Sequence, residues 1–134
     1  MKTILLIATG GALGAVLRWL VSSRVDHVTG SFSKNLPIEP VGTLVVNGIG
    51  SLVIGLIFGV TMARGAMADP VRYFVVVGLL GSLTTFSTFS YHSFELLRGG
   101  FVLQAFANIV LNVTVTLVLV TVGYWVGQRC VFGH

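Results

Sequence analysis

Four long runs of the chain contain no charged side chain, and the charged residues gather in the short segments between them. The uncharged runs are residues 3–17, 40–63, 73–94 and 101–128. A helix needs about 20 mostly apolar residues to cross the hydrocarbon core of a bilayer, and the last three runs reach that length unaided. The first run reaches it if Arg18 is tolerated and the helix continues to Ser22. The pattern therefore predicts transmembrane helices at about 3–22, 41–62, 73–96 and 101–127.

Turn-forming residues separate the predicted helices. Asp69-Pro70 precedes the third helix, Gly99-Gly100 follows it, and Pro40 precedes the second. Proline is favoured at the start of a helix and glycine just after its end. Residues 23–39 form the longest linker, which we expect to be irregular or a short surface helix. We therefore interpret residues 1–134 as a single transmembrane domain.

The composition favours an all-α integral membrane protein over a soluble one. Hydrophobic residues make up 54% of the chain and charged residues 9%, against about 25% charged in a typical soluble domain. The first run begins like a signal peptide, with a basic residue before an apolar stretch. It continues to Leu20 and is followed by further membrane segments, so we expect it to be retained. The net charge of +4 is scattered over helix ends, so we expect a lipid bilayer and no nucleic acid as partner.

Lysine and arginine are balanced between the two ends of the predicted bundle. Cytoplasmic loops normally carry the excess of these residues. One end has four of them and the opposite end also has four, respectively Lys2, Arg64, Arg72 and Arg129, and Arg18, Arg24, Lys34 and Arg98. Two interpretations stay open. One dominant loop charge fixes a single orientation, or the chain inserts both ways round and forms an antiparallel homodimer.

Small residues four positions apart predict close helix contacts. Such pairs let helix backbones approach one another in membranes. They occur in three of the predicted helices, as Gly10/Gly14, Gly11/Ala15, Gly55/Gly59 and Gly123/Gly127. A chain with four short helices also has little interior for polar groups, which favours a dimer.

Two polar stripes run along the second and fourth predicted helices. Residues four apart share a helical face, and the stripes consist of Thr43, Asn47 and Ser51, and of Asn108, Asn112 and Thr116. They have two interpretations: hydrogen bonds that hold helices together, worth about 0.6–2 kcal/mol each, or the lining of a polar path.

The third helix has the pattern of a broken helix. Two glycines, Gly78 and Gly81, precede a segment, 84–90, in which five of the seven residues carry hydroxyl groups. Membranes tolerate irregular backbone only where it binds something or meets water. Freed carbonyl groups suit a small cation such as Na⁺, whereas hydroxyl and amide groups suit an anion. A kinked packing helix is the alternative.

Two phenylalanines, Phe86 and Phe89, follow the predicted break and share a helical face. They are either packing residues or, because an aromatic ring has a positive edge, donors to a small anion. Such a site would hold an anion without the full positive charge that blocks release. Arg18 either raises the anion concentration in a vestibule or anchors its helix at the membrane surface.

Apart from Glu95 near the end of the third helix, the predicted membrane helices contain no aspartate or glutamate, and no nucleophile is paired with a base. We therefore expect no enzymatic activity. A proton-coupled exporter of organic cations would lack its usual carboxylate.

Three motifs together resemble the Fluc (CrcB) family of fluoride-specific ion channels. They are GAVLRW at 14–19, GTLVVN at 42–47 and GSLTTFSTF at 81–89, and the resemblance spans nearly the whole chain. It implies an antiparallel, dual-topology homodimer in the inner (plasma) membrane. Two fluoride pores would lie at the dimer interface, with a structural Na⁺ at its centre.

Carried over by position, the resemblance also implies roles for single residues. Asn47 would line the pore, Phe86 and Phe89 would flank the anion, and Ser87 would contribute a hydroxyl group. Thr43 and the fourth-helix stripe (Asn108, Asn112, Thr116) would continue the polar track, and Arg18 would stand in the vestibule. The Gly81 and Thr84 carbonyl groups would hold Na⁺. The chain departs from the family at Gly81-Ser82, where Gly-Gly is common.

We therefore expect a fluoride-selective channel that lets fluoride leave the cytoplasm passively. A dual-topology transporter of the small multidrug-resistance kind is one alternative, and proton flux that depends on a substrate would favour it. A structural membrane subunit is the other alternative. Free replacement of Asn47 and the two phenylalanines would favour that one.

Overall fold

The computed structural model describes residues 1–30 and 40–132, and these residues are almost entirely helical. The elements in chain order are α1 (Lys2–Gly30), α2 (Val41–Arg64), the π-helix η1 (Val71–Leu80), α3 (Gly81–Leu83), α4 (Phe86–Arg98) and α5 (Val102–Phe132). Within the described residues, four helical segments are long and apolar enough to cross a membrane: Lys2–Gly30, Val41–Arg64, Val71–Arg98 and Val102–Val131. The prediction of an all-helical chain with four membrane-length segments is thus confirmed.

Helix α1 is longer than the predicted range of 3–22, because it continues to Gly30. Residues 23–29 contain no proline or glycine, so nothing in the sequence stops the helix before Gly30. The first part of the predicted linker is therefore continuous with the membrane helix. The rest of that linker, including Lys34 of the charge balance, lies outside the described residues.

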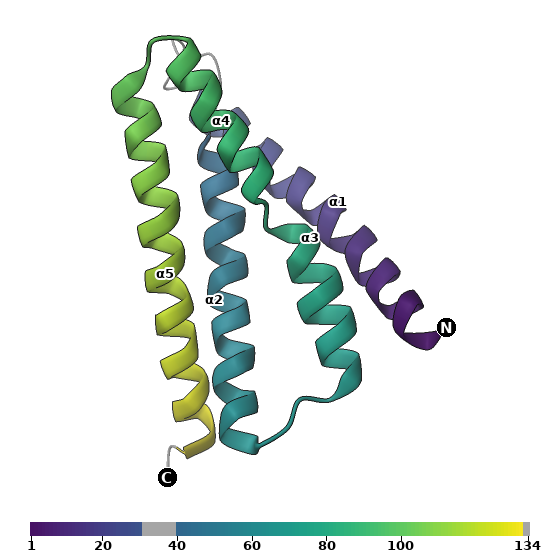
Figure 1. The fold of residues 1–134 in the computed structure, drawn as a ribbon. Helices are drawn as coiled ribbons and strands as arrows, with labels where there is room; N and C mark the ends of the chain where they lie inside the picture. The colour runs from purple at the N-terminus through teal and green to yellow at the C-terminus, as the bar shows by residue number, and fades with distance from the viewer. Residues whose placement is uncertain (31–39, 133–134) are drawn as a thin grey trace.

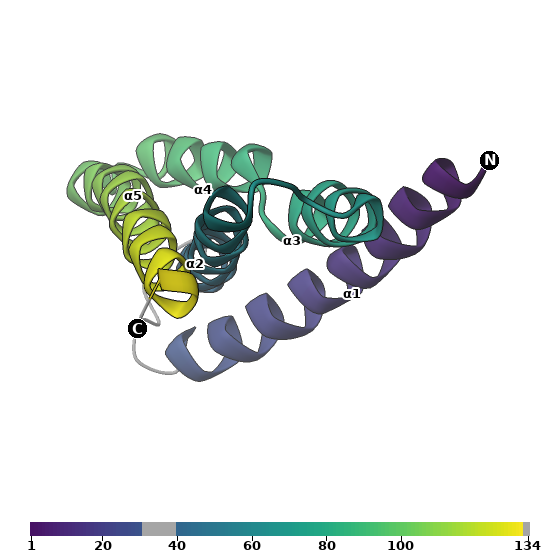
Figure 2. The same ribbon diagram turned by 90° about the horizontal axis from the view of Figure 1, so that it is seen from below.

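The other helices form an open arrangement around α2 (Figure 1). Figure 2 shows α5, α2 and α3 in a row, with α4 along one side of the row and α1 running obliquely along the other. The start of α1 and the end of α5 lie toward the end of the molecule that holds the connection from α2 to η1 (Figure 1). Glycines with positive φ angles end two of the helices: Gly65 (φ 83°) follows α2 and Gly100 (φ 83°) follows α4.

Glycines bring α2 and α5 into close contact over one half of their length. A Cβ atom added to Gly55 or Gly59 would overlap the carbonyl groups of Val120 or Tyr124 on α5. On the other side of the seam, a Cβ on Gly123 or Gly127 would overlap the carbonyl groups of Leu52 or Leu56 on α2. Both predicted small-residue pairs therefore serve a contact within the chain.

The contact between α1 and η1 is built in the same way. A Cβ atom on Gly10 or Gly14 would overlap the backbone carbonyl of Phe74 or Leu79. Gly78 of η1 faces α1 in return, where its Cβ would lie 2.8 Å from the Ile7 carbonyl oxygen. The N-terminal half of the third membrane-length segment is thereby attached to α1.

The third membrane-length segment changes direction between Leu83 and Phe86. Thr84 (φ −82°, ψ 153°) and Thr85 (φ −151°, ψ 118°) are both extended. Before them, η1 and α3 pack on α1, and after them α4 packs on α5. The two extended residues carry the chain across α2, from the α1 side of the molecule to the α5 side (Figure 1).

Candidate functional site at the helix break

Asn47 of α2 binds the extended backbone of Thr85 on both sides. Its Oδ1 accepts a hydrogen bond from the Thr85 N–H group at 2.8 Å. Its Nδ2 donates to the Thr85 carbonyl oxygen at 3.3 Å. An extended residue inside an apolar bundle would otherwise leave these two backbone groups unpaired, at a cost of about 1–3 kcal/mol each. One amide side chain thus stabilises the break.

The side chain of Thr85 then starts the next helix. Thr85 is the N-cap of α4, and its Oγ1 accepts a hydrogen bond from the Thr88 N–H group at 3.2 Å. The same hydroxyl lies 3.0 Å from Thr88 Oγ1 and 3.2 Å from Ser87 Oγ. A threonine at this position is a favoured cap because its oxygen satisfies an N–H group that has no partner within the helix. The hydroxyl cluster noted in the sequence therefore has a local structural role.

These contacts remove the helical donors of two carbonyl groups. In a continuous helix the Gly81 carbonyl would accept from the Thr85 N–H group, and the Thr84 carbonyl from the Thr88 N–H group. Here the Thr85 N–H group donates to Asn47 and the Thr88 N–H group donates to Thr85 Oγ1. Gly81 and Thr84 line the same cavity. Their carbonyl oxygens suit a hard cation such as Na⁺, which unwound backbone binds in other membrane proteins.

Glycine at position 50 makes room for the break. A Cβ atom on Gly50 would overlap the methyl group of Thr84. Ser82, at the position where the sequence resemblance leads us to expect glycine, is helical, and no non-glycine residue in the described chain has a positive φ angle. Its Oγ would lie 3.3 Å from a Cβ on Gly11 of α1. The Cβ of Ser82 is therefore compatible with the backbone angles of this break.

A directed chain of hydrogen bonds links Asn47 to α5 and back to α4. Asn47 Nδ2 donates to Asn112 Oδ1 at 3.2 Å, and Asn112 Nδ2 donates to Asn108 Oδ1 at 3.0 Å. Asn108 Nδ2 donates to Ser93 Oγ at 2.9 Å, and Ser93 Oγ donates to the Phe89 carbonyl at 3.0 Å. Asn108 and Asn112 are 6% and 4% exposed. The two asparagines therefore make the interhelical hydrogen bonds that the sequence offered as one interpretation of the stripe.

Ser93 is not among the site residues predicted from the sequence. It lies on α4 four residues after Phe89, so it shares a face with that ring, and it is buried. The signal that would have found it is the same four-residue spacing that identified the asparagine stripe.

The two phenylalanines make an edge-to-face pair but differ in exposure. Their ring centroids lie 5.3 Å apart at an interplanar angle of 62°. Phe86 is 79% exposed and Phe89 is 8% exposed. Phe89 thus contributes to packing, whereas packing within the described chain does not account for Phe86.

Two cavities meet beside the exposed ring. One is about 370 Å³ and is lined by α2, the break and Thr116 of α5. The other is about 240 Å³ and lies between α4 and α5. They share three residues, Asn47, Phe86 and Thr116. An amide, a hydroxyl group and an aromatic ring therefore lie where the two cavities adjoin, and neither cavity has a charged side chain among its lining residues.

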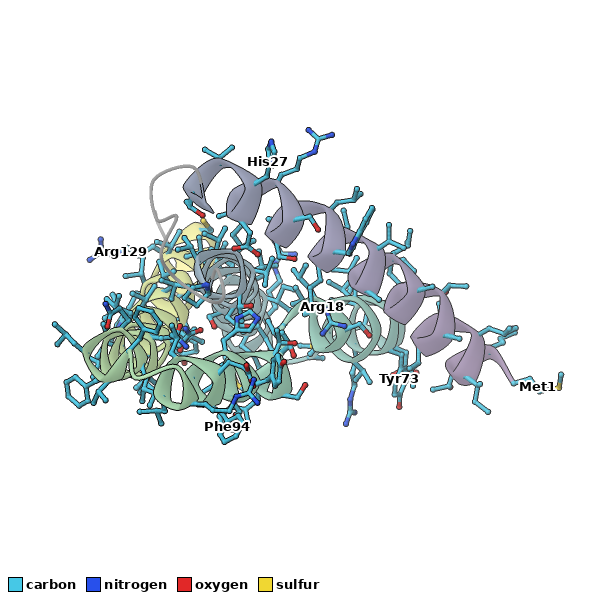
Figure 3. The ribbon with its side chains drawn as sticks, turned by 90° about the horizontal axis from the view of Figure 1, so that it is seen from above. Met1, Arg18, His27, Tyr73, Phe94 and Arg129 are labelled. Carbon is cyan, nitrogen blue, oxygen red and sulfur yellow. The ribbon has the colours of Figure 1, made fainter. Side chains whose placement is uncertain are left out.

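The remaining predicted residues lie away from these cavities or face other groups. Thr43, 3% exposed, contacts His92 rather than Asn47. Ser87 is exposed next to Thr85. Arg18 is partly exposed, and in Figure 3 it lies on the inner side of α1, over the helix formed by η1 and α3. The described residues contain no group of three or more His, Cys, Asp or Glu side chains that could hold a metal ion.

The fold and this site define a multi-pass membrane protein with a break in its third membrane-length segment. Residues 5–124 match the family model described as CrcB-like protein, Camphor Resistance (CrcB). The chain therefore belongs to the CrcB family.

Curated relatives match over almost their whole length. The fluoride-specific ion channel FluC of Pyrococcus abyssi is 41% identical over 129 residues, which cover 96% of this chain and 98% of the relative. The protein of the same name from Shewanella halifaxensis is 41% identical over 134 residues, 100% of this chain and 99% of the relative. Fluoride-specific ion channel FluC 1 of Methanosarcina acetivorans is 42% identical over 123 residues, 92% and 88% of the two chains.

Proposed function

We propose that this protein is a fluoride-selective ion channel, not an enzyme, and that it lets fluoride leave the cytoplasm passively. The proposal is supported by relatives that carry the name fluoride-specific ion channel. The observation that carries it is the uncharged space shared by Asn47, Phe86 and Thr116. Its donors are the Asn47 amide and the Phe86 ring edge, and the Thr116 hydroxyl group joins them if it exchanges its 2.6 Å hydrogen bond to the Asn112 carbonyl oxygen.

This set of donors suits the passage of a small anion. Fluoride is tightly hydrated, so a selective path must replace lost water with donors at close range. A full positive charge would hold the ion too firmly, because conduction requires release as well as binding. The positive edge of the exposed Phe86 ring and the neighbouring polar groups give partial stabilisation instead.

Asn47 Nδ2 is the donor best placed to exchange its partner for fluoride. Its two hydrogen bonds, to the Thr85 carbonyl and to Asn112 Oδ1, are 3.3 and 3.2 Å long, at or beyond the long end of the usual range for N–H···O bonds. The 2.8 Å bond that Asn47 Oδ1 accepts from the Thr85 N–H group is shorter. We infer that Oδ1 keeps the side chain in place while the Nδ2 protons, which are fixed in the amide plane, exchange one of their present acceptors for the passing ion.

The wider path runs along the predicted polar track. Phe86, Phe89 and Ser87 flank the ion next to Asn47, and Thr116, Asn112 and Asn108 continue the track on α5. Thr43 continues the track on α2, and Arg18 stands in the vestibule, where it raises the local concentration of fluoride. Asn108 and Asn112 are buried and bonded to each other, so their contribution requires that they exchange hydrogen bonds as Asn47 does.

The functional unit we propose is an antiparallel, dual-topology homodimer in the inner (plasma) membrane, with two pores at its interface. The balance of basic residues supports insertion in both orientations. In this assembly the break in each chain lies at mid-membrane, and the breaks of the two copies meet. The Gly81 and Thr84 carbonyl groups, which have lost their helical donors, would then hold a structural Na⁺ together with their counterparts.

Efflux of fluoride from liposomes tests the proposed function. Purified protein is reconstituted into vesicles loaded with fluoride or, in parallel, with chloride, and ion loss is followed with selective electrodes. We expect rapid fluoride loss and chloride loss no faster than in protein-free vesicles. Equal loss of the two anions would contradict selectivity, and no fluoride loss from folded protein would contradict the channel itself.

A second measurement tests the assembly. Cross-linking in native membranes should give a dimer, and replacing Na⁺ with a bulky organic cation during purification should lower its thermal stability. A protein that stays monomeric and is indifferent to Na⁺ would contradict this part of the proposal.

A further inference from the structure

Three helices meet at the end of the bundle where α2 begins. The N-cap of α2 is Pro40, which provides no side-chain hydrogen bond. Instead, Asp26 Oδ1 of α1 accepts a hydrogen bond from the Gly42 N–H group at 2.7 Å. The first N–H groups of a helix lack partners within it and favour negative charge. Asp26 therefore caps α2 from a neighbouring helix, and its carboxylate stays at this end of the bundle.

His92 of α4 lies beside this cap. Its Nδ1 is 3.4 Å from the hydroxyl oxygen of Thr43, and the Asp26 carboxylate interacts electrostatically with the ring. Thr43 is one helical turn before Asn47 on the same face of α2. The imidazole ring is thus placed at the mouth of the proposed polar track.

Few other charges reach the ring from the helices that pack around it. In the described part of α2, no charged residue occurs before Arg64 at its far end, and α5 has none before Arg129. On α4, Glu95 is held by Arg98 at 2.9 Å, and the ring of Tyr91 lies 6.3 Å away from His92. Among the described residues, Asp26 is thus the charged group that interacts electrostatically with His92.

We propose that His92 sets the charge at this mouth of the path and that fluoride enters faster when the ring is protonated. The inference rests on the proposed channel function. With a neutral ring, the Asp26 carboxylate places a negative charge beside Thr43, which opposes the attraction that Arg18, on the same helix as Asp26, exerts on an entering anion. Protonation adds a positive charge that offsets this negative charge. Histidine is the side chain whose charge ordinarily changes near neutral pH, so the positive charge at the mouth should increase as the pH is lowered.

Fluoride efflux from liposomes at a series of pH values between about 8 and 5 tests this inference. Because the neutral HF fraction grows as the pH falls and crosses a bilayer unaided, the rate in protein-free vesicles is measured at each pH and subtracted. We expect the wild-type rate to rise on the order of fivefold as the pH falls, as expected for one charge acting about 4 Å away through water. His92→Gln should lose this rise, because glutamine can bond to Thr43 but cannot gain a charge.

His27→Gln is the matched control. His27 is an exposed histidine one residue after Asp26, and Figure 3 shows it on the outer side of α1. This variant should keep the wild-type pH profile. If His92→Gln does not fold, His92→Lys tests the same claim, because a permanently charged side chain should give a fast rate that no longer changes with pH.

Either of two results would overturn the inference: a wild-type rate that is flat over the pH range, or a His92 variant that keeps the wild-type rise. Both leave the channel function standing. Absence of fluoride efflux at every pH would instead overturn the proposed function, and this inference with it.

Discussion

At one end of their interface α2 and α5 meet through glycines, and at the other end they meet through asparagines. In the glycine half, Gly55 and Gly123 each place their backbone against a carbonyl group of the other helix. In the asparagine half, Asn47 and Asn112 join the helices by a 3.2 Å hydrogen bond. The same pair of helices is therefore held by close backbone packing in one half and by side-chain hydrogen bonds in the other.

The difference separates support from function. Close packing of backbones leaves no group free to change partner, so the glycine half acts as a fixed scaffold. Amide side chains can exchange one hydrogen-bond partner for another at little net cost. The break in the third membrane-length segment lies against the asparagine half, where Asn47 binds Thr85. A moving ion needs exchangeable donors on a rigid frame. The asparagine half provides the donors, and the glycine half provides the frame.

The largest effect on stability is expected from adding a side chain to a glycine in the glycine half of the α2–α5 interface. Gly55→Ala places a Cβ atom onto the Val120 carbonyl group, so the helices must separate along the seam. Overpacking of this kind costs about 1–3 kcal/mol or more. Thermal unfolding in detergent should show a clear fall in the melting temperature and a loss of folded protein.

Gly48→Ala is the control on the same helix. Its Cβ would lie 3.1 Å from Leu119 Cδ1, the end of a flexible side chain, and the cost should stay below about 1 kcal/mol. Equal destabilisation by the two alanine variants would show that the backbone contact at Gly55 has no special role.

The next largest effect is expected at Asn47, and it concerns flux more than folding. Asn47→Asp keeps the oxygen that accepts from the Thr85 N–H group, but replaces the donating nitrogen with a second, negatively charged oxygen. Loss of a donor of this kind corresponds to about 1–3 kcal/mol, so fluoride efflux should fall at least about tenfold. Thr121→Val is a control on α5, because the exposed hydroxyl of Thr121 bonds only to Leu117 of its own helix. An Asn47→Asp variant as active as the wild type would remove Asn47 from the path.

A smaller effect is expected at the far end of the asparagine chain. Ser93→Ala leaves the buried Asn108 Nδ2 without its 2.9 Å acceptor. The free energy of unfolding should fall by about 1 kcal/mol, with fluoride efflux changed less than at Asn47. Ser90→Ala, at an exposed position of the same helix, should leave stability unchanged. If both serine variants unfold alike, the hydrogen bond to Asn108 does not stabilise the bundle.

The membrane-length helices could be predicted because their signal is local. Each uncharged run is bounded by charged or turn-forming residues, and length alone decides whether it can cross a bilayer. The end of α1 was missed because a polar helical segment, residues 23–30, looks like a linker when only hydropathy is considered. The helices that the glycines contact could not be predicted from the sequence either, because four-residue spacing does not say which helix lies opposite.

The candidate site was predicted in its residue types and only partly in its geometry. The spacing of Asn47 and Asn112 placed each on a polar stripe, but not their contact with one another or with the backbone of Thr85. Phe86 and Phe89 were indistinguishable in the sequence, whereas the structure exposes one and buries the other. These distinctions depend on the direction in which α4 leaves the break, which three-dimensional packing determines.

Fluoride efflux through Phe86→Ile, measured beside Phe94→Ile and the wild type in matched vesicles, tests the central claim most directly. Phe86 and Phe94 are exposed residues of α4, 79% and 58% respectively, so neither substitution should affect folding. Isoleucine keeps the apolar bulk and removes the ring edge. We predict that Phe86→Ile loses most of the fluoride efflux while Phe94→Ile keeps it. Undiminished efflux through folded Phe86→Ile would contradict a path beside this ring.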